Sequence, residues 1–226
     1  MTTMQTREHE ALNAYLKVLK SNGADDVALG RHCEFLLAIF PAIANAEFDN
    51  AAYRDAVENA LSRFDKREWP FGLAVAREYF HFWIKDFKSI AALNAEGGFS
   101  PNPVDWQPLD IDLKALWKIL DTAKFATAET WPMKAYTLAL RQAGADKALI
   151  DARIKLVKIL LIRLRDAPEK TNRNYRIVVD ATVPLLENRE MRRVFFTVVR
   201  EFYHFWMGDP DAASRIGIAS GSTSFV

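Results

Sequence analysis

Apolar residues recur every three to four positions along most of the chain, which is the spacing of helices with one buried face. From residue 8 to residue 21 they form one continuous stripe, and Gly23 marks the end of that helix. Asp25 stands where a side chain can cap the next helix, which we expect to end before Pro41. The pattern therefore predicts two helices in this first stretch.

Two more helices are predicted directly after them. Asp49 or Asn50 begins a third helix, which the pattern carries to about Phe64. Pro70 fits the first turn of a fourth helix, which continues to about Asp86. The first turns of this fourth helix are apolar nearly all round, so we expect it to lie buried at the centre of the fold.

The second half of the chain shows the same spacing of apolar positions. Asp112 begins a predicted helix over residues 111–124, and further helices follow it. Pro168 separates two of these, and Pro184 lies within another, which it should kink. Ala, Leu, Lys, Arg and Glu dominate the periodic stretches, and this composition favours helices. The expected fold class is all-α.

A segment of the fourth helix returns in the second half of the chain. Residues 77–83 and 200–206 are identical at five of seven positions, and the other two positions exchange Tyr for Phe. Because weaker matches keep the same order at nearly the same offset, we expect two diverged copies of one unit of about four helices. The weaker matches are Tyr15 with Tyr136, Asp25 with Asp146, and Tyr53 with Tyr175.

This repeat predicts a tandem duplication with four parts. The first helical repeat covers residues 1–95, and the second covers residues 130–215. Residues 96–129 join them through an extended linker rich in Gly and Pro, followed by the extra helix. Residues 216–226 are rich in Gly and Ser, and we expect them to form a flexible tail.

Charge is balanced over the whole chain but differs between its halves. Residues 1–110 contain 11 Lys and Arg against 16 Asp and Glu, whereas residues 111–226 contain 19 against 13. One interpretation is that the two halves attract each other. The other interpretation is that the basic half binds a polyanion.

Several function classes lose support from the sequence. Cys33 is the single cysteine, so the chain forms no internal disulfide and has no Cys-based zinc motif. No signal peptide and no membrane-spanning stretch is recognisable, so we expect a cytoplasmic location and no membrane partner. No phosphate-binding loop, nucleophile elbow or zinc-protease motif occurs, and we name no catalytic residue.

Charged residues of the repeated segments recur near the predicted core. Buried charges need partners, and each copy offers arginines, carboxylates and a histidine for that purpose. We therefore expect a buried network of ion pairs that sets the register of the helices and needs no cofactor. Its candidate members are Arg54, Glu58, Arg77, Glu78 and His81 in the first copy, and Arg176, Asp180, Arg200, Glu201 and His204 in the second.

The order of these acids and histidines resembles that of the di-iron carboxylate four-helix proteins. The matching residues are Glu58, the pair Glu78 and His81, Asp180, and the pair Glu201 and His204. Glu and His three residues apart share a helix face, so the resemblance implies an alternative site for two iron or manganese ions. It departs from the family in its shorter hairpins and in the arginines nearby.

Each copy also resembles the helical, SAM-like core-binding domain of tyrosine recombinases. The features that carry this resemblance are a first helix with Leu12, Tyr15, Leu16 and Leu19, a turn at Gly23, a helix ending in Phe35 and Leu36, and a last helix with Arg77, Phe80, Phe82 and Trp83. That domain clamps duplex DNA, so the resemblance implies DNA binding. The catalytic half of a recombinase has no counterpart in this sequence, so strand cleavage is not implied.

The second copy is richer in the cations that DNA binding needs. Part of this basic run alternates with apolar residues, which is also the pattern of the solvated face of an amphipathic helix. The candidates for phosphate contacts are Arg153, Lys155, Lys158, Arg163, Arg165, Lys170 and Arg173. We expect a non-catalytic interaction protein that binds duplex DNA through this copy. The alternatives are a di-metal oxidoreductase and a scaffold that binds another protein.

Overall fold

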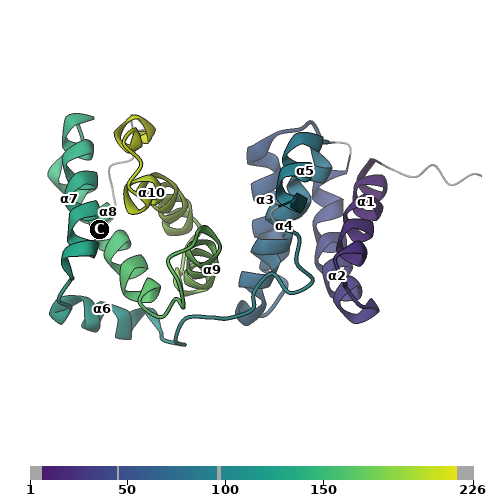
Figure 1. The fold of residues 1–226 in the computed structure, drawn as a ribbon, viewed down its shortest axis with the longest axis horizontal. Helices are drawn as coiled ribbons and strands as arrows, with labels where there is room; N and C mark the ends of the chain where they lie inside the picture. The colour runs from purple at the N-terminus through teal and green to yellow at the C-terminus, as the bar shows by residue number, and fades with distance from the viewer. Residues whose placement is uncertain (1–6, 45, 96–97, 218–226) are drawn as a thin grey trace, which may run out of the picture. The chain divides into compact units, whose positions relative to one another are not determined.

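The computed structural model describes residues 7–44, 46–95 and 98–217. Within these ranges the chain folds into α-helices and short 3-10 helices without any β-strand, which confirms the all-α class. The chain divides into two compact units, Met1–Trp106 (unit 1) and Gln107–Val226 (unit 2), and each contains its own buried core (Figure 1). Within the described residues, no helix combines the length and the apolar character needed to cross a membrane.

Unit 1 is built around a central helix, as the sequence predicts. Its elements are α1 (Arg7–Ser21), α2 (Asp26–Ile43), α3 (Asn50–Leu61), the 3-10 helix η1 (Lys66–Glu68), α4 (Trp69–Trp83) and α5 (Phe87–Ala95). Helix α4 packs against α1, α2, α3 and α5. The Asp25 carboxylate accepts a hydrogen bond from the backbone N–H of Ala28 at 2.8 Å, so Asp25 caps α2 as expected.

Unit 2 is held together by its two longest helices. Its elements are α6 (Leu113–Thr122), α7 (Thr127–Gln142), α8 (Lys147–Leu164), α9 (Asn172–Thr182), the 3-10 helix η2 (Val183–Leu185), α10 (Arg189–Met207) and the 3-10 helix η3 (Ala212–Arg215). Helix α10 packs against α7 and α8, and α8 also packs against α6 and α9. Asp112 and Asp146 cap α6 and α8 through backbone N–H groups at 2.7 and 2.8 Å.

Helix ends in unit 1 differ from the expectations at three places. Helix α2 continues through Pro41 to Ile43, so the expected end before the proline is wrong. The missing N–H of Pro41 leaves the carbonyl of Leu37 without its helical partner, and Leu37 is exposed, so water can reach that carbonyl. Helix α3 ends at Leu61, before Phe64. Helix α4 ends at Trp83, and the unexpected helix α5 follows it.

The expected kink at Pro184 is also wrong. Helix α9 ends at Thr182, and Pro184 lies in the following 3-10 helix, near its beginning, where a missing N–H costs no helical bond. The proline therefore ends a helix instead of bending one.

Part of the linker belongs to the core of unit 1. The ring of Phe99 is buried against Tyr15 and Phe82, and its carbonyl accepts a hydrogen bond from the Asn22 side chain at 2.9 Å. Within the linker, Glu96 and Gly97 lie outside the described residues. In the expected flexible tail, the same is true from residue 218 onward.

Gly72 of α4 lies directly against side chains of α2 and α3. A Cβ atom on Gly72 would lie 2.5 Å from a ring carbon of Phe35 and 2.9 Å from a methyl group of Leu61. We therefore expect Gly72→Ala to destabilise unit 1 by about 1–3 kcal/mol through overpacking. The helix-propensity gain of about 1 kcal/mol that alanine brings offsets only part of the larger overpacking costs in this range. Urea unfolding of the full chain measures the change.

Gly30 in α2 offers a matched control, because a Cβ there would meet no atom within 4 Å. Gly30→Ala should leave stability unchanged or raise it. Equal losses from both substitutions would contradict close packing at Gly72.

Candidate functional site

A buried tyrosine of α1 joins the helices of unit 1. The Tyr15 hydroxyl donates a hydrogen bond to Glu78 Oε2 on α4 at 2.8 Å, and its oxygen lies 2.9 Å from Nδ1 of His32 on α2. The other ring nitrogen of His32 lies 3.2 Å from the carbonyl oxygen of Pro101. Three helices and the linker therefore meet at one polar cluster.

Unit 2 contains a similar cluster, in which a tyrosine again donates to a glutamate but an arginine takes the place of the histidine. Tyr136 of α7 donates to Glu201 Oε2 on α10 at 2.7 Å, and Arg153 of α8 donates to the same oxygen at 2.7 Å. The N–H of Gly217 donates to the other carboxylate oxygen at 3.0 Å, and its carbonyl accepts from Arg153 at 3.3 Å. Glu201 and Arg153 thus form a buried ion pair whose remaining hydrogen bonds go to the Tyr136 hydroxyl and to the backbone of Gly217.

The two clusters differ in charge at one position. Burial lowers the pKa of His32 and favours its neutral ring, whereas the guanidinium of Arg153 is a permanent cation. Burial, together with the neighbouring carboxylate of Glu78 or Glu201, raises the pKa of Tyr15 and Tyr136 well above the ordinary value, so both phenols keep their protons. His32, Arg153, Tyr15 and Tyr136 are buried, and their hydrogen bonds join neighbouring helices.

A second pair of tyrosines makes matching contacts in the two units. The hydroxyl of Tyr53 donates to the carbonyl of Ala76 at 2.7 Å, and that of Tyr175 donates to the carbonyl of Val199 at 2.6 Å. The rings of these tyrosines pack on Trp83 and Trp206 with centroid distances of 5.0 and 4.9 Å. The first bond fixes α3 against α4, and the second fixes α9 against α10.

The four arginines that were expected to belong to a buried network are not buried. Arg54, Arg176 and Arg200 are exposed, and Arg77 is half-buried. Among the expected acids, Asp180 and Glu201 are buried, while Glu58 and Glu78 are half-buried. The cation that neutralises Glu201 comes from α8, at a position that the sequence analysis placed on a phosphate-binding surface.

The two repeated histidines lie near the C-terminal ends of α4 and α10. His81 Nδ1 is 3.9 Å from the carboxylate of Asp86, and His204 Nδ1 is 2.9 Å from that of Asp209. Within residues 7–44, 46–95 and 98–217, no three His, Cys, Asp or Glu side chains converge as ligands of one ion would. Within each described unit, the Glu-x-x-His residues therefore do not converge with a third metal ligand.

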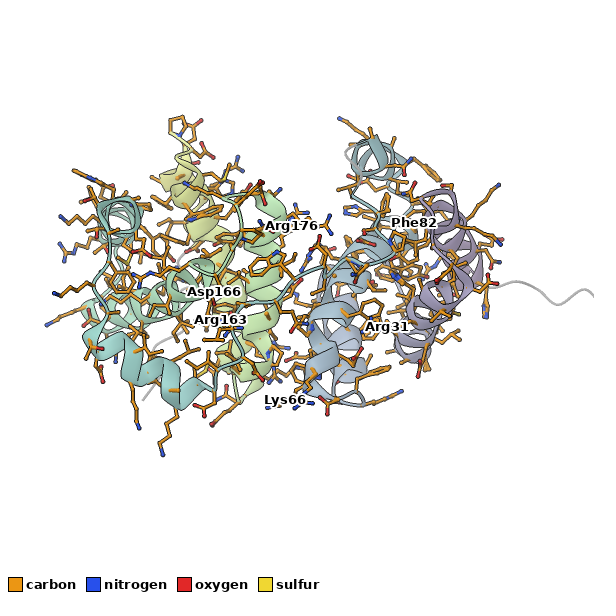
Figure 2. The ribbon with its side chains drawn as sticks, turned by 60° about the horizontal axis from the view of Figure 1, so that its bottom comes forward. Arg31, Lys66, Phe82, Arg163, Asp166 and Arg176 are labelled. Atoms are coloured by element: carbon orange, nitrogen blue, oxygen red, sulfur yellow. The ribbon has the colours of Figure 1, made fainter. Side chains whose placement is uncertain are left out.

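Two members of the expected basic surface are buried, which corrects that prediction. Arg153 pairs with Glu201, and Arg163 donates to the carbonyls of Leu109 and Ala181 at 3.4 and 3.3 Å. Burial lowers the pKa of Arg163, and the nearby Asp166 carboxylate partly opposes this effect (Figure 2). Neither guanidinium can reach a phosphate in solvent, because both are bonded inside the unit.

The other predicted cations are at the surface or only partly buried. Lys155, Lys170 and Arg173 are exposed, and Lys158 is half-buried. Arg165 is exposed but forms an ion pair with Glu129 at 2.7 Å, so a carboxylate already neutralises it. The Lys170 ammonium lies 4.8 Å from the centre of the Trp206 ring, where a cation–π contact holds it.

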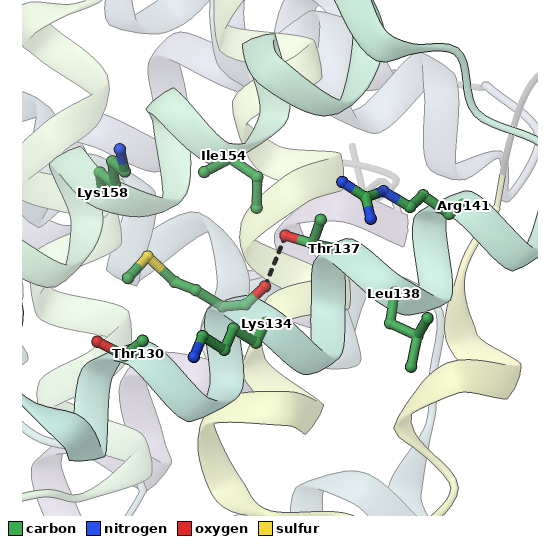
Figure 3. A pocket seen from close by; sticks show the side chains of 8 residues that line it. Thr130, Lys134, Thr137, Leu138, Arg141, Ile154 and Lys158 are labelled. Atoms are coloured by element: carbon green, nitrogen blue, oxygen red, sulfur yellow. Dashed lines mark hydrogen bonds between the residues drawn. The ribbon is translucent and has the colours of Figure 1, made fainter.

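A groove of about 410 Å³ lies on unit 2 between α7 and α8 (Figure 3). Three of its lining residues are cationic and none is acidic. Threonine and apolar side chains make up the rest, and the groove is open to solvent. The lining residues are Thr130, Met133, Lys134, Thr137, Leu138 and Arg141 from α7, and Ile154 and Lys158 from α8.

Of the three cations of the groove, sequence analysis named only Lys158. Lys134 and Arg141 are seven residues apart and therefore share a face of α7. That spacing is the signal in the sequence, although α7 contains fewer cations than α8. Lys134, Arg141 and Lys158 are referred to below as the groove cations.

No family model, no curated protein and no solved structure matches the chain. Function is therefore inferred from the residues and contacts of the chain itself.

Proposed function

We propose that the protein is a non-catalytic nucleic-acid-binding protein and that the groove between α7 and α8 is its binding site. The observation that carries this proposal is a groove with three cations and no carboxylate in its lining. A phosphate backbone neutralised by Lys and Arg supplies most of the sequence-independent affinity for nucleic acid. The hydroxyls of Thr130 and Thr137 donate to the backbone carbonyls of Ala126 and Met133 at 2.9 and 2.8 Å, so the three cations would supply the phosphate contacts.

The shape of the groove favours a polymer over a small molecule. Sites for small ligands enclose about 70–90% of the ligand surface, whereas this groove is open to solvent along α7. Lys134 and Arg141 are separated by two helical turns, or about 10.5 Å along the axis. This distance corresponds to about three nucleotides of a stacked strand at about 3.4 Å each.

We also propose that the two units are diverged copies of one ancestral unit. The proposal is supported by the same tyrosine-to-glutamate and tyrosine-to-carbonyl hydrogen bonds in both units, at positions that the sequence repeat aligns. The recombinase-like character of each copy remains a prediction. We keep the cytoplasm as the proposed location, because a single cysteine suits a reducing compartment.

Charge removal in the groove tests the binding proposal. Wild-type protein should bind a labelled 20-nucleotide strand or duplex in fluorescence anisotropy at about 50 mM salt. If three phosphates are contacted, affinity for the single strand should fall about 20-fold between about 50 and about 200 mM salt. The triple variant Lys134→Gln, Arg141→Gln, Lys158→Gln should lose at least tenfold in affinity at low salt and most of its salt dependence.

A second triple variant, Lys114→Gln, Lys118→Gln, Lys147→Gln, is the matched control. These lysines are exposed on unit 2 but do not line the groove, so the same net charge is removed. The control should bind nearly as well as wild type. Equal losses in both variants, or no binding of wild type to either nucleic acid at low salt, would overturn the proposal.

A further inference from the structure

An exposed tryptophan lies beside the groove on α7. Trp131 is 67% exposed, whereas Trp69, Trp83 and Trp206 are buried in the two cores. The ammonium of Lys134, a groove cation, lies 5.7 Å from the centre of the Trp131 ring. A large aromatic ring left in water next to a cation is typical of a binding surface.

Apolar and cationic residues alternate along this face of α7. Trp131, Lys134, Leu138 and Arg141 follow one another at intervals of three, four and three residues, so they share one side of the helix. Leu138 is also exposed, at 55%. Figure 3 shows Lys134, Leu138 and Arg141 of this series on α7, and the third groove cation, Lys158, on α8.

Resting on the proposed function, we infer that the groove takes single-stranded nucleic acid and that Trp131 stacks on one of its bases. In a duplex the faces of the bases are covered by their neighbours, and a protein meets only phosphates, sugars and base edges. An unpaired base exposes its π-face, and aromatic side chains next to cations bind such bases in a sequence-tolerant way. Lys134 lines the groove and contacts the ring, so it can hold the phosphate of the stacked nucleotide.

An acidic protein helix is the competing occupant of this face. A helix that docks in a groove uses apolar anchors spaced three or four residues apart. On α7 the exposed apolar side chains are two turns apart with a cation between them, which matches the alternation of base and phosphate better. We therefore argue for the nucleic acid and include the acidic peptide in the test.

The test compares full-length wild type, Trp131→Ala and Trp131→Phe by anisotropy with a 12-nucleotide thymidine strand, a mixed-sequence 12-base-pair duplex and inorganic polyphosphate. Trp131→Ala should weaken binding of the strand about 5- to 150-fold, the effect of losing one stacked base. Trp131→Phe should keep most of the affinity. Binding of duplex and polyphosphate should not change, because no phosphate contact is removed.

Phe87→Ala is the control for removing an exposed aromatic ring, because Phe87 is 73% exposed on unit 1. It should not affect binding of the strand. If Trp131→Ala has no effect while loss of the groove cations abolishes binding, stacking is overturned and the proposed function stands. Equal weakening of strand and duplex binding by Trp131→Ala would also overturn stacking. The same holds if a twelve-residue polyglutamate peptide competes for the groove as well as the thymidine strand does. If wild type binds neither nucleic acid, both proposals fail.

Discussion

Replacing Arg153 with methionine is expected to destabilise unit 2 by about 3–5 kcal/mol. The side chain is buried, and its removal leaves the Glu201 carboxylate in the interior without its cation. The carbonyl of Gly217 also loses a donor. Urea unfolding, followed by the fluorescence of the full chain, measures the loss.

Two further variants separate the ion pair from simple loss of charge. Lys155→Met removes a cation from an exposed position of the same helix and should change stability by less than about 0.5 kcal/mol. Adding Glu201→Gln to Arg153→Met removes the stranded charge and should recover part of the loss. A single variant Arg153→Met as stable as Lys155→Met would contradict the buried pair.

Trp83→Ala should destabilise unit 1 by about 3–5 kcal/mol. The indole is fully buried and packs against Tyr53 and Phe48 with centroid distances of 5.0 and 5.3 Å. Its removal opens a cavity between α3 and α4 that the neighbouring rings only partly fill. Thermal or urea unfolding of the full chain provides the measurement.

Trp131→Ala serves as the control, because it deletes the same side chain from an exposed position. Its effect on stability should stay below about 0.5 kcal/mol. Similar losses from the two substitutions would mean that burial does not determine the contribution of these tryptophans.

Local signals in the sequence predict the beginnings of helices well. Asp25, Asp112 and Asp146 each precede an apolar-periodic stretch, and each caps the helix that follows it. Such signals depend on neighbours within one turn, so they are legible without knowledge of the fold. The ends of helices are harder to predict from sequence. Helix α2 continues through Pro41 because the carbonyl of Leu37, which loses its hydrogen bond there, is near solvent.

Burial of arginines on α8 was predictable in principle. Arg153, Leu156, Leu160 and Arg163 are spaced at three and four residues and therefore share the core-facing side of the helix. Arginine is rarely buried unless it is paired, so its residue type favours a surface position and opposes what the periodicity indicates. The spacing identifies the core-facing side of α8, but the sequence does not show which groups the buried arginines bind.

The partners of the central glutamates could not be predicted from sequence. Tyr15 and Tyr136 lie more than 60 residues from Glu78 and Glu201, and only the packing of α1 on α4 and of α7 on α10 brings them together. Glu and His three residues apart share a helix face, but here the two side chains have different partners. Spacing restricts which groups can meet, and tertiary packing decides which do.

Nucleic-acid binding at the groove between α7 and α8 is tested most directly by amide NMR spectra of the labelled full chain with and without a saturating 20-nucleotide strand. Binding at this groove predicts that the shifted resonances belong to residues of α7 and α8, above all Lys134, Arg141 and Lys158. The core resonances of unit 1 should remain in place. Shifts confined to unit 1, or to α9 and α10 without α7, would contradict the proposed site.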